Sequence, residues 1–215
     1  MSSPELDGLI VEHLADLDQA AIRISGIETA IFTAMGQRAK EWAEGHGWVS
    51  DFDYPEDDGW DDWAKWVAPP DWRTADTAVE NSKFDGKFEL SLGDGDTGWG
   101  QAGEDWFYLT RLCRVAAGQI GLRFSRPDFV KVPRWKQAIP RIREIVTHPS
   151  FIVITASKEP ALFLPFKIDA AALAAALRDE DPGAALGPFE TALDTLLDTK
   201  PAFDQVLQHL RPSAG

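Results

Sequence analysis

Cysteine and histidine are scarce in this chain, and long apolar runs are absent. The 215 residues include one cysteine and four widely separated histidines. A single cysteine excludes an intramolecular disulfide, and no two histidines have the close spacing of a zinc site. The longest apolar runs, such as Ala170–Leu177, are far too short to cross a bilayer. We therefore expect no membrane segment, no structural metal and no cofactor.

Targeting and catalytic signatures are also missing. The N-terminal residues lack the basic and apolar regions of a secretory signal peptide, which favours a cytoplasmic location. Gly93, Gly95 and Gly98 match the spacing of a phosphate-binding loop, but Asp94 and Asp96 between them would repel phosphate. The glycine-rich segment is therefore predicted to be a turn between strands.

Charge, in contrast, is abundant and unevenly distributed. The formal net charge is −14 at pH 7, yet Arg111–Arg143 holds nine bases and one acid. Asp51–Asp62 holds seven acids and no Lys or Arg, together with three aromatic residues. So acidic a chain is not expected to bind nucleic acid except through its basic segment. The two segments predict two surfaces of opposite charge.

Tryptophan is abundant as well, with nine residues against two tyrosines. Six of the nine lie between Trp42 and Trp72. Tryptophan suits both binding surfaces and small cores, because it combines a large contact area with one polar group. Large aromatic side chains are more often buried than exposed, which favours packing in the core or under a lid.

Apolar residues recur at alternating spacings of three and four over Leu6–Trp42, which predicts a long N-terminal helix. Ser25 and Gly26 predict a kink in this helix or a break between two helices. A helix of this length would span roughly 55 Å at 1.5 Å per residue, which is longer than the rest of the domain is wide. It therefore needs a partner surface, either on its own sheet or in a homodimer. We expect a helical segment over 1–44 and a single α+β domain over 45–215.

The remaining segments predict an α+β fold. An acidic, Trp-rich loop or lid is expected over 48–76, and the C-terminal helices are expected to pack on a central antiparallel sheet of about 4–6 strands with an intervening helix. The predicted strands are Lys87–Leu92, a hairpin of Trp106–Val115 with Gln119–Phe124, and the pair Phe151–Thr155 and Ala161–Ile168; the predicted helices are Pro133–His148, Ala170–Arg178, Gly187–Asp198 and Ala202–Leu210.

The clearest enzymatic hypothesis is a Mg²⁺-dependent nuclease-like site. Its candidate catalytic residues are Asp76, Glu80, Asp85 and Lys87, because two carboxylates at a strand edge can hold Mg²⁺ while a lysine activates water. An acid-x-Lys triplet is, however, expected about once or twice by chance in so acidic a chain, and it occurs again at Asp198-Thr199-Lys200. The motif is therefore weak evidence for a nuclease.

A non-enzymatic protein-binding function is favoured, of the antagonist or toxin-neutralising type. The acidic loop would attract a basic partner and its aromatic residues would hold that partner. The alternatives are the nuclease and a structural or assembly protein that dimerises through the N-terminal helix. The predicted partner-binding residues are Asp57, Asp58, Trp60, Asp61, Asp62 and Trp63.

The basic segment has two interpretations. Its arginines can form a phosphate-facing patch, or they can receive the acidic loop of the same chain or of a dimer mate. The second is favoured because it explains both charged segments without a ligand. The predicted basic patch comprises Arg111, Arg114, Arg123, Arg126, Arg141 and Arg143.

Overall fold

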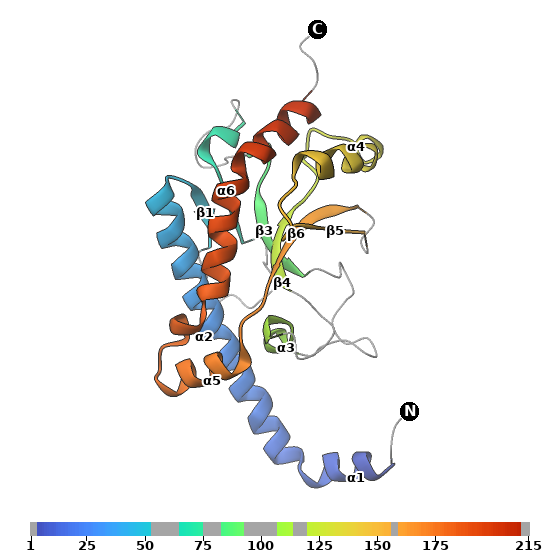
Figure 1. Cartoon of the computed structure of the whole chain (residues 1–215). Coiled ribbons are helices and arrows are strands. Elements are labelled where there is room, and N and C mark those ends of the chain that lie inside the picture. The colour runs from blue at the N-terminus through green and yellow to red at the C-terminus, as the bar shows by residue number, and fades with distance from the viewer. Residues whose placement is uncertain are drawn as a thin grey trace.

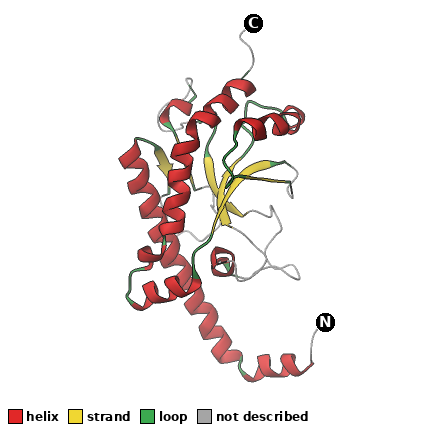
Figure 2. Ribbon diagram, in the orientation of Figure 1, coloured by secondary structure: helices red, strands yellow, loops and turns green. Residues whose placement is uncertain are grey.

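The computed structural model describes residues 4–52, 65–74, 83–92, 107–113, 120–155 and 159–211. These residues form the predicted α+β fold, in which long helices cover one face of a six-stranded antiparallel sheet (Figures 1 and 2). The strand order is β1-β2-β3-β4-β6-β5. A long helix near the N-terminus extends beyond the sheet and its covering helices (Figure 1).

This N-terminal part consists of α1 (Pro4–Glu12) and α2 (Leu14–His46). The chain turns at His13 and α2 then continues through Gly26, so the predicted alternative of a break between two helices at Gly26 is wrong. A glycine inside a helix costs about 1 kcal/mol relative to alanine, and this does not suffice to end a helix whose second half is buried. Gly47 ends α2 in the left-handed conformation, with a φ of 68°.

Segment 48–76, which we expected to be an irregular loop, contains a pair of short strands. Strand β1 (Val49–Asp51) pairs with β2 (Trp66–Ala68), and the short 3-10 helix η1 (Pro70–Trp72) follows. The prediction of an irregular loop is therefore wrong at both ends of the segment. Its acidic middle, residues 53–64, lies outside the described residues.

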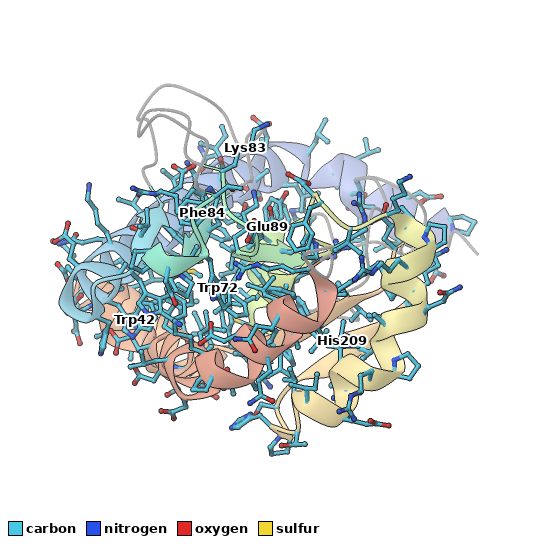
Figure 3. All side chains as sticks on the ribbon, turned by 90° about the horizontal axis from the view of Figure 1, so that it is seen from above. Trp42, Trp72, Lys83, Phe84, Glu89 and His209 are labelled. Atoms are coloured by element: carbon cyan, nitrogen blue, oxygen red, sulfur yellow. The ribbon has the colours of Figure 1, made fainter. Side chains whose placement is uncertain are left out.

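The central strands alternate in the way the sequence predicts. Strand β3 (Phe88–Leu92) pairs with β4 (Ile120–Phe124), which pairs in turn with β6 (Ala161–Phe166). The buried Phe88 and Leu90 lie opposite Phe124 and Leu122, whereas Glu89 lies opposite Arg123. Because successive side chains of a strand point to opposite faces, the apolar residues face the helices and the charged pair faces away from them. Figure 3 shows this division, with Trp72 beside α6 and Glu89 across the sheet.

The predicted hairpin of Trp106–Val115 with Gln119–Phe124 is wrong, because Tyr108–Cys113 forms the helix α3. Only its second half is a strand, β4. A short apolar run fits a helix as well as a strand, and here Tyr108 and Leu112, four residues apart, are both buried. Cys113 is buried in α3, as expected for a small apolar residue, and this burial raises the pKa of its thiol.

Helices and strands of the C-terminal half are mostly as predicted. In the sequence, helix α4 (Val132–Ile145) follows β4 and precedes β5 (Ile152–Ile154). Strand β5 pairs with β6 at the edge of the sheet. The Asp169 side chain accepts a hydrogen bond from the amide of Ala172 and caps α5 (Ala170–Arg178), as predicted. The 3-10 helix η3 (Pro182–Ala185) follows it.

The two predicted final helices are one helix, α6 (Gly187–Leu210), which includes Pro201. Proline removes one backbone hydrogen bond, but the apolar face of α6 is buried on both sides of it, at Leu196 and Phe203. The predicted cap, Thr199, instead donates its hydroxyl to the carbonyl of Thr195 inside the helix.

The main core lies between the sheet and the layer formed by α2, α4 and α6. Its largest fully buried side chains include Trp72, Trp135 and Phe203. The prediction that tryptophans pack in the core is confirmed for Trp48, Trp72 and Trp135. Among the helices described, none combines the length and apolarity that crossing a membrane requires.

Candidate functional site

The N-terminal arm, defined as residues 4–27, exposes an unusual number of apolar side chains. Leu6, Leu9 and Ile10 of α1 are 55%, 53% and 42% exposed. Leu14 and Leu17 at the start of α2 are 61% and 46% exposed. Single exposed leucines are ordinary on a protein surface, but a contiguous group of them indicates a contact surface.

The exposed apolar residues of α2 continue the face that is buried later in the same helix. Eighteen residues make five turns at 3.6 residues per turn, so residues 18 apart point in the same direction. Leu17 is 46% exposed, while Met35, which shares its direction, is fully buried. Leu14 and Phe32 form a second such pair, with exposures of 61% and 1%. The stripe is defined as Leu14, Leu17, Ala21 and Ile24; the first three are exposed and Ile24 is partly buried. It is therefore a core-like face that is largely uncovered.

We define the body as the described residues from 28 onward. Within the body, the second half of α2 is fixed to the other elements. Trp42 donates its indole N–H to the Asp194 carboxylate of α6, with a nitrogen-to-oxygen distance of 2.9 Å. Arg38 lies 3.3 Å from Glu190, also on α6. Helix α2 also packs against β1 and η3. These contacts hold α2 firmly, so the direction of the arm is set by the body.

A buried acid marks the boundary between the arm and the body. Glu28 is 7% exposed, and its carboxylate accepts a hydrogen bond of 2.8 Å from the amide of Leu109 in the first turn of α3. Burial raises the pKa of the Glu28 carboxyl, and the hydrogen bonds from the amides of Leu109 and Tyr108 partly oppose this rise. The sequence shows Glu28 only as an interruption of the apolar pattern. Its role was missed because α3 was predicted to be a strand.

The predicted partner-binding residues Asp57, Asp58, Trp60, Asp61, Asp62 and Trp63 lie outside the described residues. The described residues on either side of this stretch lie in or next to β1 and β2. Asp51 pairs with Trp66 across β1 and β2, and Phe52 is buried against Phe189 of α6. The described chain before and after the stretch therefore lies at one edge of the sheet.

Two of the four candidate nuclease residues are described. The Asp85 carboxylate lies 2.7 Å from the guanidinium of Arg211, and the Lys87 ammonium lies 2.8 Å from Glu89. Both side chains are thus in ion pairs with different partners. Asp76 and Glu80 lie outside the described residues, so the nuclease stays a hypothesis, which a calorimetric titration with Mg²⁺ tests.

The predicted basic patch is spread over several elements. Arg111 is buried in α3, and Arg123 lies in β4 opposite Glu89. Arg126 forms an ion pair of 2.7 Å with Glu159.

Two further arginines of this predicted patch lie on α4. Arg141 lies 2.6 Å from Glu144, and Arg143 donates to the carbonyl of Phe151. Arg114 lies outside the described residues. The patch therefore stays a prediction. Its described arginines are spread over α3, β4, the segment after β4, and α4, and four of them lie beside acidic or carbonyl groups.

A polar depression lies beside the root of the arm. It has a volume of about 540 Å³ and is lined by α2 and by residues 181–183, with Gln37, Arg38 and Asp181 among its polar residues. Within the described ranges, no three His, Cys, Asp or Glu side chains are close enough together to hold a metal ion. The depression offers polar contacts, whereas the arm offers the larger apolar surface.

Comparison with known proteins gives no relative for this chain: no family model, no curated protein and no solved structure matches it significantly. Within the described residues, the exposed apolar face of the arm is the best-supported candidate surface for binding.

Proposed function

We propose that this protein is a non-enzymatic protein-binding module and that its N-terminal arm is the docking element. The observation that carries the proposal is the matched exposure along α2. Leu14 and Leu17 are about half exposed or more, whereas Phe32 and Met35 in the same directions are buried. An apolar face of this kind is stabilised when another surface removes it from water.

The position of the arm also supports docking. Its root is fixed by Glu28 and by the packing of α2 on α6, so little orientational freedom is lost when the arm binds. Amphipathic helices commonly bind through apolar residues at spacings of three and four, which is the spacing of the stripe.

Site-specific photo-crosslinking in the native cells tests this proposal. A photoreactive amino acid at position 17 replaces a stripe residue, and the same amino acid at position 19 lies about 180° from the centre of the stripe at 100° per residue. We expect a protein adduct from position 17 and none from position 19. Equal adducts from both positions, or none from position 17, would contradict a docking role for the stripe.

A second candidate function is capture of a basic partner by the acidic segment 51–62. It is favoured by the described residues that flank the segment, because the β1–β2 pair and the buried Phe52 fix the chain at one edge of the sheet. Seven acids without a Lys or Arg among them attract positive charge.

Charge removal tests this second function. Changing Asp57, Asp58, Asp61 and Asp62 to Asn is expected to slow association with a lysine-rich probe peptide and to flatten the salt dependence of its rate. Trp60→Ala is expected mainly to speed dissociation. Unchanged rates in both variants, measured by stopped flow, would remove the acidic segment as a binding site.

A further inference from the structure

We infer that the arm binds the arm of a second copy of this chain, in antiparallel orientation. This inference rests on the proposed function, because it names the partner of the docking surface proposed above. The position of the body and the pattern of residues along the stripe identify the occupant.

The body decides the orientation. From Glu28 onward the face of α2 that continues the stripe is covered by the body, as the burial of Ile31 and Met35 shows. In a parallel pair the two bodies would lie at the same end of the stripe, where each would occupy the space of the other. In an antiparallel pair the bodies lie at opposite ends, and the stripes remain in contact along residues 14–24.

The stripe matches itself in this orientation. When residue i of one copy lies level with residue 38 − i of the other, Leu14 lies level with Ile24 of the second copy and Leu17 with Ala21 of the second copy. Near the middle of the stripe the larger Leu17 then lies beside the smaller Ala21, and all four members of the stripe meet apolar residues. A two-fold pair requires this kind of self-complementary surface.

Two of the three charged residues in the first half of α2 lie away from this seam. At 100° per residue, Asp16 and Arg23 lie about 120° and 140° from the centre of the stripe. Both are exposed. Asp18 lies at the edge of the stripe, so the two copies of Asp18 approach each other near the two-fold axis. The seam therefore carries one like-charge contact that can be removed by mutation.

Helix α1 extends the contact. Leu6, Leu9 and Ile10 have the spacing of one helix face, and all three are exposed. Figure 1 shows α1 turned toward the side of α2 on which α3 lies. In the antiparallel register, Leu14, the first residue of α2, lies level with Ile24 of the second copy, close to Glu28, where the second body begins. Each α1 then reaches the root of the other arm.

The number of contacting residues limits the size of this interface. A standard interface uses roughly 20–30 residues from each partner. Only part of residues 4–27 faces the second copy, because residues such as Gln19 and Arg23 lie on the far side of α2. The arm alone therefore forms a contact smaller than the standard interface, and association is tested at high protein concentration.

Light scattering of the full chain tests association. We expect a dimer at 100 µM, and we expect Leu17→Asp to weaken dimerisation at least 100-fold because it places a charge in the desolvated seam. Gln19→Asp, on the opposite side of α2, is the matched control and should leave the mass unchanged. A monomeric wild-type protein at 100 µM overturns the inference.

Cysteine pairing tests the orientation. The only native cysteine, Cys113, is buried and should not compete. A mixture of Leu14→Cys and Ile24→Cys chains is expected to form mixed disulfide dimers. Each variant alone should form none, because ten residues, about 15 Å at 1.5 Å per residue, separate each position from its own copy along the helix. Self-linked Leu14→Cys dimers would overturn the antiparallel register.

The like-charge contact provides a third measurement. Asp18→Asn is expected to tighten the dimer about two-fold at low salt, since like charges at close helical positions repel weakly. An unchanged dissociation constant would contradict a two-fold axis at residue 19.

Failure of this inference is distinguishable from failure of the proposed function. A photo-crosslinked adduct from position 17 with a mass other than twice that of the chain would overturn the second-copy assignment and would leave the arm as a docking element. Absence of any adduct from that position would remove both.

Discussion

The two halves of α2 have the same apolar periodicity and opposite environments. In the second half, Ala39 and Met35 are fully buried, and Trp42 is hydrogen-bonded to Asp194. In the first half, Ala21 and Leu17 point in the same directions and are exposed. The comparison teaches that periodicity identifies which face of a helix will be covered. It does not identify what covers it.

The largest difference between the halves is expected on truncation of matched side chains. Met35→Ala should lower the free energy of unfolding by about 2–5 kcal/mol, because it leaves a cavity in a close-packed core. Leu17→Ala should change it by less than about 0.5 kcal/mol, as an exposed side chain does. Denaturant unfolding at submicromolar concentration, where association contributes little, measures both. Similar losses would mean that the arm packs against its own body.

A smaller effect is expected at the contact that fixes the second half to α6. Trp42→Phe removes the hydrogen bond to Asp194 and should cost about 0.5–1.5 kcal/mol. A double-mutant cycle with Asp194→Ala isolates this contact from changes in packing. Leu14→Ala in the arm serves as the control and should show no coupling to Asp194→Ala. Coupling near zero for the Trp42 cycle would remove this hydrogen bond as an anchor of α2.

The smallest effect is expected at the boundary, where Glu28→Gln should change the pH dependence of stability. The folded state raises the pKa of Glu28, so it binds a proton more tightly than the unfolded state does. The free energy of unfolding is therefore highest below the unfolded pKa and falls as pH rises through the raised folded pKa. Glu28→Gln removes this fall.

Thermal melts of both proteins at pH 4.5 and pH 7.5, near and well above the ordinary glutamate pKa of about 4.3, measure this difference. The melting temperature of the variant relative to wild type should increase between the two pH values. The other carboxylates are the same in both proteins, so they cancel in the comparison. Parallel pH profiles would show that Glu28 does not titrate differently in the folded state.

Much of the fold was predictable because local patterns and global packing agree. Alternating residues identified β3, and Asp169 with the following alanines identified α5 as the structure has it. The errors fall where a short sequence fits two structures. Tyr108–Cys113 fits a strand or a helix, and the carboxylate of Glu28, 80 positions earlier in the chain, contributes to the helical choice by capping its first turn.

The candidate site was predictable only in part. The spacing of Leu14, Leu17 and Ile24 predicted an apolar helix face and left open whether the sheet or a second chain covers it. That choice depends on where the body ends, which is a property of the assembled sheet and α6. The break at His13 was also missed, because neither proline nor glycine marks it.

The burial of α6 has a consequence for the order of events during synthesis. Helix α6 supplies Phe189, Leu196 and Phe203 to the core that covers the second half of α2. Because a ribosome adds 5–20 residues per second, the roughly 140 residues between the end of α2 and the start of α6 take about 7 to 28 s. During that interval the second half of α2 lacks the apolar side chains that α6 supplies, although β1, α3 and η3 are made earlier. The covered half of α2 is therefore completed only after α6 has been synthesised.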